Sequence, residues 1–597
     1  MTNNPATQLP ATRNRRWRTP LARGGAAGPL AAAGLAGAVL MLPSASGYAL
    51  RVLAVAGVYA LLATGYRFIF GLAGALSLAQ GTFMGVGAYL SGILAVRYGV
   101  PFDLALPASI GGPVLLALLI AAPVLRLQTH YLALATLLVG QVALLVAVQW
   151  VDVTGGANGI GGVPPLSVAG WTLGGRGSTA ATVWVLAAAA AVPAWVLGRG
   201  RSGAAFALLR TDAAVARAAG IDTFRLRLGA FLLSAAYAGL AGSLYVHALG
   251  VLSPDVLGFP VTVTCLTIAV VGSRLRVAGA LAGAVLVIEL PEWARFLRDD
   301  YMLAFGCILL AVVVLAPGGL MEAADRLLDR FWEAPPRRLP NPAALPPLPP
   351  APGGPLLEVE DLRRTFGGVL ALDGVSLTLR PGEVLGVIGP NGSGKTTLLN
   401  AVSGIFPPAS GAVRLRGTVL TGRAPHAVAR MGVARTFQTA VLAPELSALD
   451  NVALARRGVP YARARAEALG LLVRLGAGPD AATAATALPP GVIRRVEIAR
   501  ALATRPRVLL LDEPAAGLDE AEQADLARRL RGIAADGVAL LIVEHTMAFL
   551  LPLADRLLCL DEGRPIAAGT PAAVQADPRV VEAYLGTAAA ALVSAPA

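Results

Sequence analysis

The chain has 597 residues, of which 56% are hydrophobic and only 14% are charged. Soluble globular proteins carry about 25% charged residues, so this composition excludes a purely soluble protein and predicts membrane-spanning segments. The formal net charge of +13 is also typical of nucleic-acid-binding proteins, but no DNA- or RNA-binding motif accompanies it. Arginines in the cytoplasmic loops of a membrane protein explain the charge better.

The first 28 residues are polar and contain five arginines, which predicts a cytoplasmic basic tail at residues 1–28. An apolar run from about Pro29 to Pro43 follows, and the small residues after it imitate a signal peptide. A second apolar stretch, Val52 to Thr64, comes almost at once. We therefore favour an uncleaved first span over a cleaved signal.

Residues 29–325 are predicted to form a transmembrane domain. Further apolar segments lie near 68–96, 104–125, 131–151, 181–198, 228–250, 258–273, 277–290 and 302–317. Since a helical span needs about 20 residues, these runs suggest eight to ten spans. The arginine-rich stretch Arg199 to Arg227 interrupts them and is expected to be cytoplasmic. With the tail and the C-terminal half also cytoplasmic, the number of spans must be even.

A proline-rich segment separates two regions of different composition. Residues 333–355 contain ten prolines, which remove backbone donors and favour an extended, semi-rigid linker. From residue 356 to about 590, charges of both signs return, and short β-type runs alternate with helical ones. This pattern predicts an α/β domain with a largely parallel sheet.

The most specific motif is a phosphate-binding loop that fits G-x-x-x-x-G-K-[ST]. It consists of Gly389, Pro390, Asn391, Gly392, Ser393, Gly394, Lys395 and Thr396, with Thr397 continuing into the next helix. A predicted strand at 384–388 precedes it, as the motif requires. The glycines allow backbone N–H groups to surround phosphate oxygens at a helix N-terminus. Lys395, the only lysine of the chain, supplies a compact charge that arginine would not match.

A second motif supplies carboxylates. The apolar run Val508 to Leu511 ends in Asp512 and Glu513. Asp512 and the Thr396 hydroxyl are suited to hold Mg²⁺, and Glu513 is suited to polarise the attacking water. By itself such a pair is often an ordinary surface feature, but together with the phosphate loop it predicts an ATP-hydrolysing site.

With these motifs, residues 356–586 resemble an ATP-binding cassette (ABC) nucleotide-binding domain. The resemblance implies that Phe366 stacks on adenine and that Gln438 joins Mg²⁺ to the permease contact. It implies that Asp519 lies in a loop at the dimer interface. It further implies that His545, after a predicted strand at 540–543, contacts the γ-phosphate.

The family's signature, usually L-S-G-G-Q, is degenerate in this chain. The corresponding residues are Leu488, Pro489, Pro490, Gly491 and Val492. In the family each ATP lies between one subunit's phosphate loop and the other's signature, so a homodimer would lack the signature serine at both sites. A second, different cassette is therefore favoured as the partner.

The first half resembles the permease of branched-chain (hydrophobic) amino acid ABC importers over most of residues 28–325. The matching stretches occur in the family's order at 71–81, 131–136, 154–160, 238–245 and 253–255. The stretch from Arg199 to Arg227 is similar to the loop that couples permease and cassette, and it keeps Ala216 and Gly220 of that loop. A plain basic loop would explain its charges equally well.

The resemblance implies a permease subunit fused to its ATPase subunit in a bacterial inner membrane, with the ATPase domain in the cytoplasm. It implies ATP and Mg²⁺ as cofactors, and it implies ATP-driven import of branched-chain amino acids. The implied partners are a second permease, a second cassette and an extracytoplasmic solute-binding protein. Three alternatives remain open: an importer of urea, amides or small carboxylates, an exporter half-transporter, and a regulatory ATP-binding membrane protein.

Overall fold

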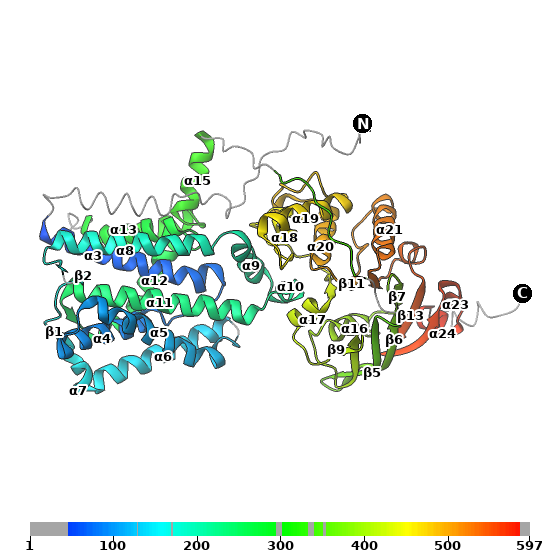
Figure 1. Ribbon diagram of the computed structural model, residues 1–597, viewed down its shortest axis with the longest axis horizontal. Helices are drawn as coiled ribbons and strands as arrows, with labels where there is room; N and C mark the ends of the chain where they lie inside the picture. Colours follow the sequence, from blue (N-terminus) through cyan, green and yellow to red (C-terminus); the bar gives the residue numbers. More distant parts are fainter. Residues whose placement is uncertain are drawn as a thin grey trace, which may run out of the picture. The chain divides into compact units, whose positions relative to one another are not determined.

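A computed structural model describes residues 46–127, 129–168, 171–293, 301–331, 339–349 and 354–585 (Figure 1). The predicted basic tail and the first apolar run, to Pro43, lie outside the described residues. The chain divides into two compact units. Among the described residues, a helical unit comprises those within 46–206 and 224–331, and an α/β unit comprises those within 207–223, 339–349 and 354–585.

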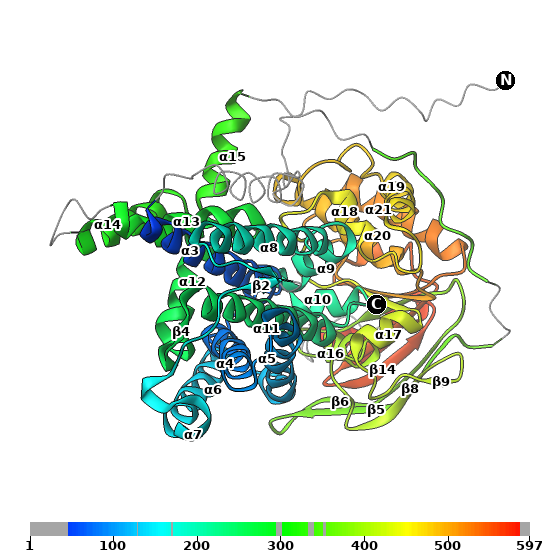
Figure 2. The ribbon, with the colours of Figure 1, turned by 60° about the vertical axis from the view of Figure 1, so that its left-hand side comes forward.

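The helical unit consists mainly of long apolar helices, several of which run side by side in both views (Figures 1 and 2). Its helices are α3 (Gly47–Tyr66), the π-helical η2 (Arg67–Leu72), α4 (Gln80–Tyr98), α5 (Phe102–Val124), α6 (Thr129–Gln149), α7 (Val151–Thr154), α8 (Arg176–Leu197), α9 (Gly200–Thr211), α11 (Thr223–Leu249), α12 (Phe259–Gly272), α13 (Val277–Trp293), α14 (Tyr301–Leu315) and α15 (Leu320–Phe331). Short 3₁₀ turns and two-residue strands complete it, namely η3 (Gly156–Asn158), η4 (Pro254–Leu257), β1 (Ile160–Gly161), β2 (Ser167–Val168), β3 (Trp171–Thr172) and β4 (Val251–Leu252).

Within the described residues, five helices are long and apolar enough to cross a membrane, or six if one bent pair counts as a span. They are Gly47–Leu72, Phe102–Val124, His130–Gln149, Arg176–Leu197 and Thr223–Leu249. This is fewer than the eight to ten that the apolar runs predicted. The runs at 258–273 and 277–290 explain part of the difference, because they form α12 and α13, the two arms of a pair bent by 119°.

The bend falls where the sequence places two arginines, Arg274 and Arg276. Ser273, which follows α12, has a φ of 145°, a left-handed backbone that a non-glycine residue rarely adopts. The buried guanidinium of Arg67 secures this turn from η2: its Nε donates to the Leu275 carbonyl at 2.8 Å, and its Nη1 donates to the Ala194 carbonyl at 2.9 Å. One buried cation thus joins three helical segments.

Glycines of α4 and α11 serve close helix packing. A side chain at Gly85 would collide with Leu257 of η4, and one at Gly242 would collide with the backbone of α4 at Met84. In lipid, the hydrophobic effect does not drive helices together, so their association depends on close packing. Small residues allow the helix backbones to approach closely enough for this. Close helix packing is therefore the structural role of these two glycines.

The α/β unit contains two sheets. Strands β7 (Val384–Ile388), β10 (Val433–Arg435), β11 (Val508–Asp512), β12 (Ala539–Val543), β13 (Arg556–Asp561) and β14 (Arg564–Gly569) form one in the order β10-β11-β12-β7-β13-β14, antiparallel only between β13 and β14. Strands β5 (Leu357–Phe366), β6 (Val369–Leu379), β8 (Ser410–Leu415) and β9 (Thr418–Val419) form an antiparallel sheet in the order β6-β5-β8-β9. The largely parallel sheet confirms the prediction, whereas the second sheet was not predicted.

Helices complete the α/β unit. They are α10 (Ala213–Ala218), α16 (Lys395–Val402), α17 (Pro425–Met431), α18 (Ala448–Ala453), α19 (Tyr461–Arg474), η6 (Ala485–Ala487), α20 (Pro490–Ala503), α21 (Glu520–Ala535), α22 (Met547–Leu550), α23 (Pro571–Gln575) and α24 (Pro578–Leu585). In both views α18, α19 and α20 gather at the opposite end of the unit from β5 and β9 (Figures 1 and 2).

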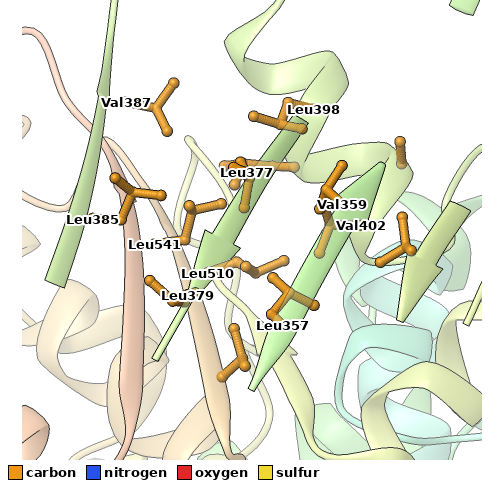
Figure 3. Packing of buried hydrophobic residues seen from close by; sticks show 14 of the residues in the cluster. Leu357, Val359, Leu377, Leu379, Leu385, Val387, Leu398, Val402, Leu510 and Leu541 are labelled. Carbon is orange, nitrogen blue, oxygen red and sulfur yellow. The ribbon is translucent and has the colours of Figure 1, made fainter. Parts of the chain in front are cut away.

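The core of the α/β unit lies between the two sheets and α16. Leu357, Val359 and Leu377 from the antiparallel sheet point toward Leu385 and Leu541 of the parallel one (Figure 3). Leu398 and Val402 of α16 join this cluster, and every one of these side chains is buried. Burial of a large aliphatic side chain contributes about 1.5–3 kcal/mol, so this cluster fixes α16, and with it the loop before α16, against both sheets.

The described part of the proline-rich segment, residues 339–349, has no helix or strand, as predicted. This segment nevertheless contacts the helices and loops of the rest of the α/β unit. The Ala343 N–H donates to the Ala466 carbonyl of α19 at 2.9 Å. Arg505 and Arg507 donate to the carbonyls of Pro347 and Pro349 at 3.1 and 2.6 Å. This stretch is therefore a strap along the unit rather than a free spacer.

Candidate functional site

The phosphate-binding loop connects β7 to α16 as the sequence predicted. Gly389 has a φ of 147°, and a side chain there would collide with the carbonyl of Leu560 on β13. Only glycine fits this combination of backbone conformation and close approach. Lys395, the first residue of α16, folds back over the loop, where its Nζ donates to the carbonyls of Gly389 and Pro390 at 2.8 and 2.7 Å.

Lys395 is 6% exposed. This burial lowers the pKa of the Lys395 ammonium from its ordinary value, while the nearby carboxylate of Glu513 acts in the opposite direction. The loop therefore holds one desolvated positive charge against its own carbonyls. Thr396 and Thr397 follow in the first turn of α16, and the Thr396 side chain is exposed.

The two predicted carboxylates lie at the carboxyl end of β11, which β12 separates from β7 and its phosphate loop in the sheet order. Asp512 is buried, and its Oδ2 lies 3.2 Å from Arg435. Burial raises the pKa of Asp512, and the Arg435 guanidinium works against that rise. The Asp512 Oδ1 is also buried and has no hydrogen-bond partner among the described residues. One oxygen is thus oriented by arginine, and the other remains available to a ligand.

Glu513 lies where three predicted residues meet. Its Oε1 accepts from Gln438 Nε2 at 3.2 Å and lies 3.4 Å from His545 Nε2. The backbone of Glu513 has a φ of 47°, a left-handed conformation that costs a non-glycine residue about 1–2 kcal/mol. Strain of this kind concentrates at functional sites. Residues from β11, β12 and the loop after β10 therefore converge on one carboxylate.

Sequence reasoning missed the buried arginines behind this site. Arg435 donates to Ser403 at 3.1 Å and also to Asn400, both on the α16 side of the loop. Arg494 of α20 donates to the carbonyl of Glu513 at 2.6 Å. Sequence alone did not distinguish these two arginines, because every basic Lys or Arg position of the chain except Lys395 is arginine.

Glu544, beside His545, was also missed. It is 2% exposed, and its two oxygens accept from the backbone N–H groups of Ala515 and His545 at 3.0 and 2.9 Å. The side chain therefore links the segment after β11 to the segment after β12. It fixes the backbone from which the His545 ring projects.

Other predicted residues lie outside this cluster. Phe366 ends β5, is 38% exposed and packs edge-on against Phe406, with ring centroids 5.5 Å apart. Asp519 caps α21, accepting from the Glu522 N–H at 2.8 Å in a reciprocal capping box. The Phe366 ring is partly exposed, with the Arg364 guanidinium 4.7 Å over its centroid, whereas Asp519 has a clear structural role as a helix cap.

The degenerate signature forms the start of α20. Leu488 is buried, Pro489 is the N-cap residue, and Pro490, Gly491 and Val492 begin the helix. No side chain caps this helix, because proline replaces the serine hydroxyl that favours an N-cap position. The substitution thus removes a helix cap as well as a polar group.

The C-terminal segment contacts the phosphate loop directly. The Gly389 N–H donates to the hydroxyl of Tyr584, on α24, at 2.7 Å. The first glycine of the loop is therefore held at its N–H by Tyr584 and at its carbonyl by Lys395. A contact between residues 195 positions apart has no local sequence signal.

The segment Ala207–Thr223 belongs to the α/β unit, where α10 packs against α17. Ala216 is buried in α10. Gly220, with a φ of 79°, turns its carbonyl toward two arginines, and Arg430 and Arg457 each donate to it at 3.1 Å. Asp222 lies 3.5 Å from His426. The predicted residues Ala216 and Gly220 are thus part of a contact surface in this unit.

Three family models match the chain. "Branched-chain amino acid transport system / permease component" matches residues 48–315, and "ABC transporter" matches residues 372–516. "Branched-chain amino acid ATP-binding cassette transporter" matches residues 564–590, the segment that contains Tyr584.

Known relatives cover the second half. The high-affinity branched-chain amino acid transport ATP-binding protein BraF of Pseudomonas aeruginosa is 37% identical over 252 residues, which are 39% of this chain and 99% of that protein. LivG of Escherichia coli, with the same description, is 38% identical with the same coverage. Among solved structures, a nucleotide-free cassette from an ABC transporter is 30% identical, with a TM-score of 0.36, over 39% of this chain and 99% of that one.

Proposed function

This chain belongs to the branched-chain amino acid family of ABC transporters, with permease and ATPase domains in one polypeptide, and we propose that it imports branched-chain or other hydrophobic amino acids. Its cassette hydrolyses ATP, and that hydrolysis is coupled to transport. The proposal divides the chain into a cytoplasmic tail (1–28), a permease domain (29–325), a linker (333–355) and an ATPase domain (356–590).

The observation that carries this proposal is the meeting of five predicted residues along neighbouring strands of the cassette. Lys395 follows β7, Asp512 and Glu513 end β11, His545 follows β12, and Gln438 reaches Glu513 at 3.2 Å. Ligands of parallel α/β sheets bind at the carboxyl ends of the strands. A chain that joins such a site to apolar spanning helices is suited to convert ATP hydrolysis into movement of a solute.

In this site Lys395 neutralises phosphate charge, and the loop's N–H groups hold the phosphate oxygens. Glu513 orients and polarises the attacking water, while His545 binds the γ-phosphate from the end of the neighbouring strand β12. Phe366 offers its partly exposed ring to adenine. Each role uses a group whose position is fixed by the contacts described above.

The residues also fit Mg²⁺. This ion prefers oxygen ligands, and Asp512 Oδ1 is a buried oxygen without a hydrogen-bond partner in the described part of the chain. Together with the Thr396 hydroxyl and the Gln438 amide oxygen, it would hold the ion. When bound, Mg²⁺ draws negative charge from the phosphates.

The assembly is proposed to contain further transporter subunits. The signature residues Leu488, Pro489, Pro490, Gly491 and Val492 lack the serine hydroxyl, which supports a second cassette of different sequence. A second permease and an extracytoplasmic solute-binding protein complete the transporter in a bacterial inner membrane. Asp519 is placed at the cassette–cassette interface, and the segment around Ala216 and Gly220 couples the permease to the cassette.

Uptake of radiolabelled leucine tests the proposal. ATP is enclosed in vesicles that contain this chain and the products of its genomic neighbours, and the solute-binding protein is added outside or left out. We expect uptake that needs ATP and the binding protein and that Lys395→Ala abolishes. Unlabelled isoleucine, urea, acetamide and acetate serve as competitors. Uptake of leucine that persists in Lys395→Ala would overturn the proposal that this cassette drives transport. ATP hydrolysis stimulated only by urea, acetamide or acetate would overturn the amino-acid assignment.

A further inference from the structure

Arg494 of α20 is a buried cation with five acceptors around the candidate site, one of which is the Asp512 carbonyl, 3.4 Å from its Nη2. It is 4% exposed. Its Nη2 donates to the carbonyls of Glu513 and Gln438 at 2.6 and 3.0 Å. Its Nη1 donates to the carbonyl of Phe437 and to Glu497 Oε2 at 2.7 and 2.8 Å. A single guanidinium therefore bridges the backbone of the two residues whose side chains meet at the site.

Glu497 fixes Arg494 in this position. The carboxylate is 1% exposed and pairs with Arg494 three residues earlier on α20. Its other oxygen accepts from the Phe437 N–H at 3.1 Å. Phe437 is therefore bound at its N–H by Glu497 and at its carbonyl by Arg494. Both backbone polar groups of Phe437 are therefore fixed by α20, directly before Gln438.

The geometry demands arginine. A guanidinium is planar and carries five donors in a fixed fork, whereas an ammonium is a point charge on a flexible stem. The five acceptors of Arg494 come from three segments, namely the stretch after β10, the end of β11 and α20 itself. A lysine at this position would keep the charge but could not bond to acceptors on all three segments at once.

We infer that Arg494 is a positioning residue for ATP hydrolysis, which sets the spacing between Gln438 and Glu513. The inference rests on the roles proposed for these two residues. Arg494 also lies on the helix that begins with the degenerate signature, two residues after Val492. A displacement of that helix by a partner cassette would reach both site residues through the same side chain.

This role makes a prediction that general destabilisation does not. Arg494 contacts neither the phosphate loop nor Lys395 in any hydrogen bond described above. Its loss should therefore leave ATP binding intact and slow the chemical step, because Gln438 and Glu513 would no longer be held at their mutual distance. It should also weaken Mg²⁺ binding, because the Gln438 side chain is proposed to hold the ion.

The test compares Arg494→Lys with Arg495→Lys in the full-length chain, reconstituted in liposomes with its neighbouring subunits. Arg495 is the next residue on α20, but it pairs with Asp525 at 3.3 Å and does not contact Gln438 or Glu513 in the described structure. In Arg494→Lys we expect kcat for ATP hydrolysis to fall about tenfold or more with KM for ATP within about threefold, and half-saturating Mg²⁺ to rise. In Arg495→Lys all three values should stay within about twofold of the unmodified chain.

Glu513→Gln is the reference variant. The hydrolysis activity that it loses is the activity of this chain's own ATP site. If Glu513→Gln is inactive while Arg494→Lys behaves as Arg495→Lys, the inference fails and the proposed function stands. If Glu513→Gln retains full hydrolysis, the proposed role of Glu513 fails, and the inference fails with it. A parallel loss of ATP binding in Arg494→Lys would indicate a purely structural role and also overturns the inference.

A second variant tests the same inference if Arg494→Lys fails to fold or assemble. Glu497→Gln leaves Arg494 in place but removes the charge that holds it. We expect the same separation of kcat from KM, with a smaller loss of kcat. An unchanged kcat in Glu497→Gln would contradict the positioning role.

Discussion

At the scale of single residues, lysine and arginine have different structural roles in the cassette. Lys395 presents a compact charge inside a tight loop, where its Nζ lies 2.8 and 2.7 Å from two loop carbonyls. Arg435 and Arg494 instead use several donors at once to fix segments behind the site. The division follows from shape, because an ammonium fits a nest of backbone groups and a guanidinium spans separate acceptors.

Glu467 of α19 is a residue on which stability should depend. It is 1% exposed and pairs with Arg456 and, at 2.9 Å, with Arg463. Burial by itself raises the pKa of Glu467, but hydrogen bonds from the two arginines outweigh it and place the pKa below its ordinary value of 4.5. A carboxyl with a depressed pKa stabilises the folded state above its unfolded pKa. That contribution is lost as the pH falls through the folded pKa.

We therefore predict that Glu467→Gln destabilises the chain by about 3 kcal/mol at pH 7, because it leaves Arg456 buried without its counter-charge. The difference should shrink as the pH falls below 4.5. Thermal unfolding of the full chain in detergent between pH 7 and 3.5 measures this, with Glu520→Gln on the exposed first turn of α21 as the control. A difference that is constant with pH would show that the ion pairs do not stabilise the fold.

At the scale of elements, α24 holds the phosphate loop from outside. The Tyr584 hydroxyl is the acceptor for the Gly389 N–H. The helix that carries it falls within the segment matched by the branched-chain cassette model, residues 564–590. A C-terminal extension of this kind therefore takes part in shaping the loop that precedes α16.

We predict that Tyr584→Phe raises KM for ATP roughly three- to tenfold, since an unpaired loop N–H costs on the order of 1 kcal/mol. kcat should change less, because Glu513 and Gln438 are untouched. ATP titration of hydrolysis measures both constants. Tyr461→Phe is the matched control, since its hydroxyl donates to Asp450 at 3.1 Å, away from the loop. Equal KM values for the two variants would rule out the role of Tyr584.

At the scale of the whole molecule, transport requires that the ATPase and the permease move together. The described contact of the segment Ala207–Thr223 is polar and specific. The Gly220 carbonyl accepts from Arg430 and Arg457, and Arg210 pairs with Glu445 at 2.7 Å. Because a backbone carbonyl is the acceptor, side-chain changes at the two arginines test this contact most directly.

The double variant Arg430→Gln with Arg457→Gln should uncouple the transporter. We expect leucine uptake to fall about fivefold or more, while ATP hydrolysis stays within about twofold, because two charge-assisted bonds are lost from the coupling contact and none from the ATP site. Uptake and hydrolysis are measured on the same vesicles. Arg423→Gln, whose side chain bonds only locally to Val419 among the described contacts, is the control. Equal losses of uptake and hydrolysis would contradict a coupling role.

The sequence by itself determined what depends on local pattern. The phosphate loop, the strands at 384–388 and 508–512 and the irregular proline-rich segment all follow from neighbouring residues, because glycine spacing, apolar runs and proline act within a few positions. The family followed from the order of such motifs. The count of spans in the whole chain stays a prediction, because the first apolar run lies outside the described residues and two short apolar runs can be two spans or two arms of one bend.

Only the tertiary structure decided which distant residues share the site. Gln438 and Glu513 are 75 positions apart, and Gly389 and Tyr584 are 195 apart. Arg494 gained its role from three segments that the fold brings to one guanidinium. Such contacts depend on sheet order and on packing against the core around α16. No local sequence pattern encodes these contacts. The arginines that support the site therefore could not be distinguished from the others among the 48 arginines of the chain.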